Sequence, residues 1–212
     1  MNIIKLSGID IMLYNKQTPI GVSLSGGADS AVLAFILMKY SNAPIHFFTL
    51  GNKLKNFVSI KHSIEVIQKC IDLTGNFSVT HHISYAHSQE RDHFFKLLID
   101  KMDSSLVNIM YTATTQIPPT DDLLKFKNTL SSDISSRRDP TVIRPKFSHY
   151  NKLYHPFLNV NKKHIKQLYY DLGILDSLFP ITRSCESLEN FQSHCGNCWW
   201  CEERLWAFDK LS

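Results

Sequence analysis

Short apolar runs alternate with longer amphipathic segments along most of the chain. The runs with the length and the β-branched or aromatic content of strands are 18–25, 44–50, 77–84 and 106–113. The segments with helical periodicity are 29–40, 60–75, 89–102 and 161–173. Strands that alternate with helices form βαβ units, so we predict an α/β fold: a Rossmann-like α/β/α sandwich built on a parallel sheet.

The stretch 114–155 interrupts this alternation. It is rich in Pro, Ser and Asp, and it is long enough to form a functional loop or lid. Four of its cations lie close together in sequence: Arg137, Arg138, Arg144 and Lys146. Such a cluster is usually a solvated face, but beside a nucleotide site it would also suit phosphates or an anionic substrate.

Composition and charge narrow the class of protein. The 212 residues are 43% hydrophobic and 20% charged, which is typical of a globular domain with a buried core. The net charge of +4 is too small for a dedicated nucleic-acid binder. No apolar stretch reaches the roughly 18 residues of a membrane helix, and the first residues lack the features of a signal peptide, so we expect a cytoplasmic protein.

A glycine pair stands between the first predicted strand and the first predicted helix, in Ser25-Gly26-Gly27-Ala28-Asp29-Ser30. The stretch is neither a Walker loop nor a Rossmann fingerprint. Its backbone N–H groups, its two hydroxyls and the positive end of the helix could hold phosphate without a lysine. Asp29 would then orient the loop or help to hold Mg²⁺. The alternative is an ordinary glycine-rich turn.

The cysteines divide into one core residue and one cluster. Cys70 lies in an amphipathic helical pattern, which favours a core role. The cluster is Cys185, Cys195, Cys198 and Cys201, and four thiolates at this spacing can close a tetrahedral Zn²⁺ site. A full thiolate set leaves no open position, so this zinc is expected to be structural. The alternatives are buried thiols without metal, or a site in which His194 replaces one thiolate.

Two further groups of residues are expected to have structural roles. The pair His81-His82 shows no ligand spacing, so we expect it to lie in a sheet or at the surface. Three tryptophans flank the cysteines, which indicates burial around the metal or at a subunit contact: Trp199, Trp200 and Trp206.

The Ser-Gly-Gly-x-Asp-Ser string resembles the PP-loop of the N-type ATP pyrophosphatases, also called the adenine nucleotide α-hydrolases. That superfamily cleaves ATP between its α- and β-phosphates and adenylates a substrate. The resemblance implies catalytic roles for Ser25, Asp29 and Ser30, together with bound Mg²⁺. It also implies an ATP site formed by Leu24, Ser25, Gly26, Gly27, Ala28, Asp29, Ser30, Ala31, Val32, Leu33 and Ala34.

A second segment, 155–174, is similar to a motif that these enzymes carry late in the chain. Its proline, lysine and final glycine are Pro156, Lys162 and Gly173. The resemblance implies that Lys162 is catalytic, as a mobile cation that reaches the phosphates. The alternative is a solvated lysine on a surface helix.

The C-terminal end resembles the zinc segment of the 7-cyano-7-deazaguanine synthase family. The residues that match in order are Ser184, Cys185, Cys195, Gly196, Cys198, Cys201 and Arg204. This resemblance implies a PP-loop domain over 1–160, with the long loop 114–155, and a helical zinc-binding segment over 161–212 packed on it.

The same resemblance implies an activity and its partners. The family adenylates 7-carboxy-7-deazaguanine, lets ammonia displace AMP to form an amide, and dehydrates the amide to 7-cyano-7-deazaguanine. The expected partners are ATP, a small carboxylate of the 7-deazapurine type and ammonia, with a homodimer allowed and nucleic acid not expected.

The middle of the chain departs from this family. Residues 50–52 read Leu-Gly-Asn where the family has a Tyr-Gly-Gln-like motif, and residues 111–123 do not align with its substrate segment. Three alternatives therefore stay open: adenylation of a different acceptor, a PP-loop sulfur transferase acting on tRNA, and a silent nucleic-acid-binding module. A zinc-bound cysteine is a poor nucleophile, which counts against the transferase.

Overall fold

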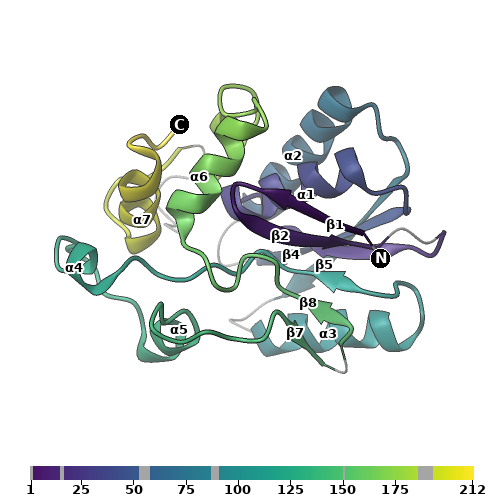
Figure 1. Cartoon of the computed structure of the whole chain (residues 1–212), viewed down its shortest axis with the longest axis horizontal. Coiled ribbons are helices and arrows are strands. Elements are labelled where there is room, and N and C mark those ends of the chain that lie inside the picture. Colours follow the sequence, from purple (N-terminus) through teal and green to yellow (C-terminus); the bar gives the residue numbers. More distant parts are fainter. Residues whose placement is uncertain (1, 15–16, 53–57, 87–90, 150, 186–192) are drawn as a thin grey trace.

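The computed structural model describes residues 2–14, 17–52, 58–86, 91–149, 151–185 and 193–212. Its centre is a mostly parallel six-stranded sheet with helices on both faces, which confirms the predicted α/β/α architecture (Figure 1). The strands of this sheet are β3 (Ile20–Ser23), β4 (Ile45–Asn52), β5 (Val79–Ala86), β6 (Met110–Tyr111), β7 (Phe147–Ser148) and β8 (Leu153–Tyr154).

The order of the strands defines where a ligand can bind. The sheet runs β5-β4-β3-β6-β8-β7, and only the edge strand β7 is antiparallel to its neighbour. From β3 the chain first builds β4 and β5 on one side, and it then returns to build β6 and β8 on the other. The direction therefore reverses between β3 and β6. In open parallel sheets, ligands bind outside the carboxyl ends of the strands at such a switch point.

Each predicted helix corresponds to a helix of the structure. The short helices α4 and α5 were not predicted, and α7 lies in the C-terminal segment that was expected to be helical. The α-helices are α1 (Ala28–Tyr40), α2 (Val58–Thr74), α3 (Arg91–Asp103), α4 (Thr120–Leu123), α5 (Ser132–Arg137), α6 (Lys162–Asp171) and α7 (Trp199–Phe208). A 3-10 turn, η2, covers Phe179–Ile181. The first two residues of the predicted helix 89–102 lie outside the described residues, and the predicted strand 106–113 is formed only over Met110–Tyr111.

Alternation along the strands divides the apolar core between the two faces of the sheet. Phe47 belongs to the larger core, which includes the buried residues of α1 and α2. Its neighbour Phe48 points to the opposite face, where it packs with Leu98 and Met102 of α3. Helix α1 is apolar nearly all round because the core surrounds it.

An N-terminal hairpin extends the larger core and was not predicted. It consists of β1 (Asn2–Leu6) and β2 (Ile9–Leu13), joined by Ser7 and Gly8, which both have positive φ as a tight hairpin turn requires. Ile9, Ile11 and Leu13 alternate toward the core and are buried.

The expectation of one long loop over 114–155 is wrong. The stretch contains α4, α5, β7 and β8, and β8 completes the parallel part of the sheet beside β6. These elements have two to six residues, which is too short to show a period in the sequence. The described part of the chain contains no helix that is both long and apolar enough to cross a membrane.

Candidate active site and metal centre

The glycine-rich turn connects the carboxyl end of β3 to α1. Gly26 has φ of +78°, and Gly27 returns to an extended conformation as the N-cap residue of α1. The Ser25 and Ser30 hydroxyl oxygens lie 3.1 Å apart, and Ser25 Oγ accepts a hydrogen bond from Gly27 N at 3.3 Å. The two hydroxyls therefore face each other across the turn.

The first turn of α1 is open toward this loop. Ala31 N donates the first helical bond, to Gly27 O, so the N–H groups of the three residues before Ala31 have no acceptor within the helix. Gly27 has no side chain with which to cap them. The positive end of α1 is thus available to an anion.

Residues 24–34, which were expected to contact ATP, divide into an accessible part and a buried part. Residues 25–30 form the turn and the helix start, whereas Ala31, Val32, Leu33 and Ala34 are fully buried in the core. These four side chains hold α1 in place and are not accessible to a ligand. Leu24 is also buried, and its N–H and C=O bond to β4.

Gly26 has a steric reason to be glycine. A Cβ at this position would lie 2.5 Å from His62 Cβ and 2.9 Å from the His62 carbonyl carbon, because α2 packs directly against the turn. A Cβ on Gly27 would meet Ser25 Oγ at 3.3 Å, Arg183 O at 3.5 Å and Ser184 Oγ at 4.0 Å, all of which are looser contacts.

We expect Gly26→Ala to lower the free energy of unfolding by about 3 kcal/mol, since left-handed strain and overpacking add at this site. Gly27→Ala, the matched control, should cost less than about 1 kcal/mol. Urea unfolding of both variants measures the difference, and equal losses would contradict this account of the turn.

Lys162 is the first residue of α6 and reaches the same turn. Its side chain is buried, with the residue only 3% exposed, so it is not the solvated lysine of the alternative interpretation. Its Nζ lies 3.3 Å from Asp29 Oδ2 and 2.7 Å from Glu203 Oε2. The second oxygen of Glu203 pairs with Arg138. Asp29, Lys162, Glu203 and Arg138 form what we call the charged cluster.

Only one of the two oxygens of the Asp29 carboxyl group has a partner in this cluster. Burial raises its pKa above the ordinary value, although the Lys162 charge acts in the opposite direction. Its Oδ1 is shielded from solvent and has no hydrogen-bond partner among the described residues. A shielded, unpaired carboxylate oxygen at a phosphate-type turn is a suitable ligand for a divalent cation.

The expectation that the cations of residues 137–146 form a solvated face is wrong for Arg138. Its side chain is buried, and its guanidinium donates to Thr115 O at 2.7 Å and to Thr115 Oγ1 at 3.1 Å. The guanidinium carbon also lies 5.3 and 5.5 Å from the ring centres of Trp199 and Trp200. Lys146, by contrast, donates to Asp10 O at the N-terminal hairpin.

Glu203 was missed by the sequence reasoning, and it is fully buried. Its position on α7 is the feature of the sequence that could have indicated its role. Trp199, Glu203 and Ala207 follow each other at intervals of four residues and are all buried, so the acid lies on the core-facing side of the helix. A carboxylate on such a face needs charged partners, which here are Lys162 and Arg138.

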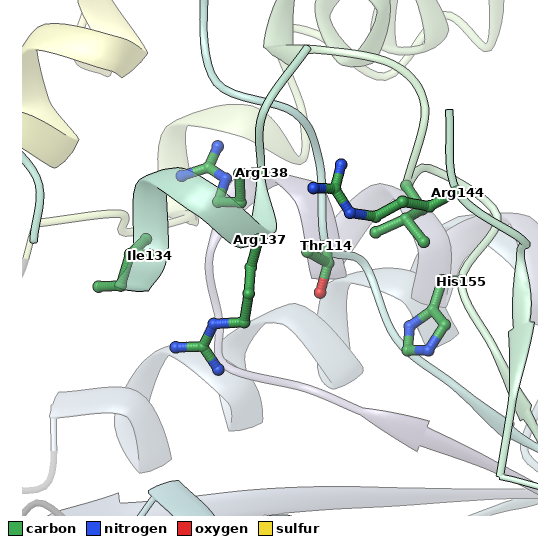
Figure 2. A pocket seen from close by; sticks show the side chains of 7 residues that line it. Thr114, Ile134, Arg137, Arg138, Arg144 and His155 are labelled. Atoms are coloured by element: carbon green, nitrogen blue, oxygen red, sulfur yellow. The ribbon is translucent and has the colours of Figure 1, made fainter. Parts of the chain in front are cut away.

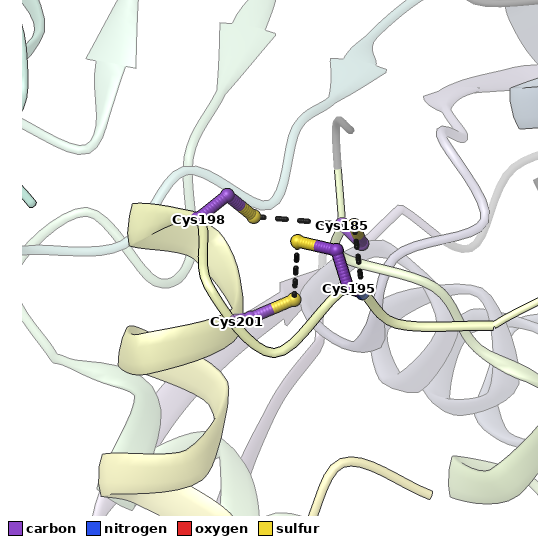
Figure 3. A group of neighbouring side chains, drawn as sticks. All are labelled: Cys185, Cys195, Cys198 and Cys201. Atoms are coloured by element: carbon purple, nitrogen blue, oxygen red, sulfur yellow. Dashed lines mark hydrogen bonds between the residues drawn. The ribbon is translucent and has the colours of Figure 1, made fainter. Parts of the chain in front are cut away.

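The four clustered cysteines converge on one point (Figure 3). Their Sγ atoms all lie within 4.8 Å of one another. Cys198 is the N-cap residue of α7 and Cys201 lies in its first turn, whereas the two other cysteines come from the preceding segment. Residues 186–192 of that segment lie outside the described residues.

The spacing of the sulfurs fits a bound metal ion. The pairs Cys195–Cys201 and Cys185–Cys198 are each separated by 3.9 Å. A tetrahedron with metal–sulfur bonds of about 2.3 Å has edges of about 3.8 Å. Asn197 N donates to Cys195 Sγ at 3.4 Å, as expected for a thiolate ligand. His194 is not part of this group, and its Nε2 accepts from Ser184 N at 3.4 Å.

Hydrogen bonds and packing join the cysteine segment to the turn. Arg183 N donates to Gly26 O at 2.9 Å. Arg204, buried on α7, donates to Ser184 Oγ at 3.3 Å and lies 3.8 Å from the centre of the Phe179 ring. Burial lowers the pKa of Arg204 to about 10.

The histidine pair lies in β5, in agreement with the expected sheet role. His81 Nε2 is 2.9 Å from Thr49 Oγ1, and His82 Nε2 is 3.0 Å from His46 Nδ1. Burial lowers the pKa of both histidines. Among the described residues, the one group of potential metal ligands is the cysteine cluster.

Comparison with known proteins agrees with this geometry. The model of the asparagine synthase family matches residues 12–115, from β2 through the glycine-rich turn to the segment after β6. That family belongs to the adenine nucleotide α-hydrolase (PP-loop) superfamily. The match indicates the general kind of chemistry, which is ATP-dependent adenylation of a carboxylate followed by amidation. No curated protein matches the chain.

Proposed function

We propose that this protein is an ATP-dependent C–N ligase that converts 7-carboxy-7-deazaguanine to 7-cyano-7-deazaguanine with ammonia. The observation that carries the adenylation step is the contact between Lys162 and Asp29 at the open N-terminus of α1. It places a buried cation, a carboxylate and unpaired backbone donors around one turn at the switch point of the sheet.

The turn residues are proposed to bind ATP through its phosphates. The N–H groups of the α1 start and the hydroxyls of Ser25 and Ser30 would face the β-phosphate and γ-phosphate, which leave together as pyrophosphate. Lys162 would supply positive charge as that group departs. Asp29 would hold Mg²⁺, which neutralises phosphate charge when it is bound.

The proposed reaction has two activations. An oxygen of the carboxylate attacks the α-phosphorus, and the bond to pyrophosphate breaks. Ammonia then attacks the acyl carbon, loses a proton and expels AMP, which leaves the amide. The amide oxygen then attacks the α-phosphorus of a second ATP and expels pyrophosphate. Loss of that oxygen with AMP, together with loss of two protons from nitrogen, gives the nitrile. Backbone donors that are fixed before the reaction stabilise the developing charge without rearrangement.

Zinc is proposed as the metal of the cysteine cluster, with a structural role. The ligands would be Cys185, Cys195, Cys198 and Cys201, which fill a tetrahedral site completely. The division into 1–160 and 161–212, the cytoplasmic location and a homodimer stay predictions that accompany this proposal.

The sulfur-transferase alternative needs a reactive thiol that is not bound to metal. Cys70 is fully buried in the core, and burial raises its pKa to about 12. A protonated, inaccessible thiol is a poor nucleophile. The described residues therefore favour a ligase.

The test of the proposed function is the product pattern. With Mg-ATP, ammonium and 7-carboxy-7-deazaguanine, the protein should release AMP and pyrophosphate and form the amide or the nitrile. Phosphorus NMR and liquid chromatography detect these products. Asp29→Asn should lower kcat by about 100-fold, which corresponds to about 3 kcal/mol of lost transition-state stabilisation.

The matched control is Asp121→Asn, which also removes an acid from the first turn of a helix but lies in α4. It should keep full activity. Formation of ADP and phosphate, or unchanged turnover in Asp29→Asn, would overturn the proposed adenylation site.

A further inference from the structure

A second site lies beside the charged cluster, beyond the carboxyl ends of β6 and β8. It is a pocket of about 220 Å³ (Figure 2). Its lining residues come from the segment after β6, from α5 and the loop after it, and from the segment after β8: Thr114, Ile134, Arg137, Arg138, Arg144, His155 and Leu158. We call it the arginine pocket. Three of its seven lining residues are arginines, and none of the described residues that line it is acidic.

Arg137 presents its guanidinium to solvent at this pocket. Its side chain is 44% exposed, and its Nε and NH2 groups bond only within α5, to the carbonyl and the carboxylate of Asp133. NH1 makes no hydrogen bond to a described residue. Since a guanidinium recognises carboxylates with two parallel N–H donors, Arg137 keeps capacity for an anionic ligand.

Arg144 adds a second positive charge. It donates to the carbonyl oxygens of Ser136, Asp139 and Val142, and it forms no salt bridge with a described residue. Its charge contributes to a lowered pKa of Asp139, after the hydrogen bonds from Thr141. His155 is neutral near pH 7, because burial lowers its pKa to about 4. The charged side chains that line the pocket are therefore all cations.

The arginine pocket is joined to the proposed ATP site through the charged cluster. Arg138 lines the pocket, and Glu203 connects it to Lys162, which contacts Asp29 at the turn. The pocket and the turn are thus linked through one charged cluster. Its volume is below the roughly 300–1,000 Å³ of pockets that enclose a drug-sized ligand, so it suits a small anion rather than a nucleoside triphosphate.

We propose that the arginine pocket binds the acceptor of the ligase reaction, a small planar molecule whose carboxylate contacts Arg137. This inference rests on the proposed function. The aliphatic side chains of Ile134 and Leu158 supply apolar contact for the body of the acceptor, and Arg144 completes the positive field. The carboxylate is then held near Arg138, which belongs to the charged cluster that also contacts the turn.

The test measures binding to the full-length protein by calorimetry, with a non-cleavable ATP analogue (α,β-methylene-ATP) present. The probes are 7-carboxy-7-deazaguanine, its neutral amide, and pyrrole-3-carboxylate as a minimal planar carboxylate. Arg137→Gln should weaken binding of the carboxylates by about 10- to 100-fold. Binding of the amide and of the ATP analogue should change less than about twofold, since neither depends on this contact.

Lys125→Gln is the matched control. Lys125 is an exposed cation on the neighbouring turn and pairs with an acid three residues earlier, but it does not line the pocket. It should leave all the affinities unchanged. Weaker binding of the ATP analogue to Arg137→Gln would assign the pocket to nucleotide phosphates and overturn the proposal.

The outcomes also separate this inference from the proposed function. Arginine-dependent binding of pyrrole-3-carboxylate without binding of 7-carboxy-7-deazaguanine would keep the pocket and reject the deazapurine acceptor. If neither carboxylate binds, or if both bind equally well to Arg137→Gln, the pocket proposal is wrong. Release of AMP and pyrophosphate with another acceptor would still support the ligase.

Discussion

Cys201→Ser is expected to release the bound zinc and to lower the melting temperature by roughly 10 °C. Metal binding contributes directly to folding at a structural site, and a loss of about 4 kcal/mol corresponds to a shift of this size in a chain of this length. The loss of stability is expected to begin at α7, because Cys201 attaches the first turn of this helix to the sulfur cluster. Metal analysis and thermal unfolding of the purified protein measure both effects.

Cys70→Ala is the control for this experiment. Cys70 is buried in the larger core, remote in sequence from the cluster, so this variant should lose some stability and keep close to one zinc per chain. The metal assignment would be refuted by wild-type protein that contains no zinc and melts at the same temperature after chelation.

Glu203→Gln is expected to lower the free energy of unfolding by about 3 kcal/mol, since removal of one partner from a buried ion pair leaves uncompensated charge. Glu203 is fully buried and its carboxylate faces Lys162 and Arg138. The substitution keeps the shape of the side chain and removes only its charge. Lys162 then keeps Asp29 as its acidic partner, whereas Arg138 loses the carboxylate with which it pairs.

The neighbouring Glu202→Gln is the matched control on the same helix. Glu202 is only partly buried and accepts hydrogen bonds from the backbone N–H groups of Lys127 and Asn128. We expect a loss of less than about 1 kcal/mol for this partly exposed group. Urea unfolding of the two variants gives the comparison, and similar losses would show that the charged cluster does not depend on Glu203.

Local patterns were sufficient to predict the larger elements of the fold. The apolar run before Ser25 and the helix after it gave β3 and α1, and the stop at Gly173 gave the end of α6. The shorter elements, such as β8 and α5, were not predictable. Two to six residues contain too little periodicity, and β8 is a strand because β6 pairs with it.

The sequence by itself determined the types of chemical group and their local order. Gly26 and Gly27 before a helix define an open, phosphate-type turn, and four cysteines within 17 residues can reach one metal, because short chain segments restrict where their residues can lie. Which distant groups meet was decided only by the tertiary structure. Lys162 meets Glu203, 41 residues away, and Arg138 joins them from a stretch that looked solvated. Burial makes these contacts obligatory, since a charge removed from water must find an opposite charge wherever the fold supplies one.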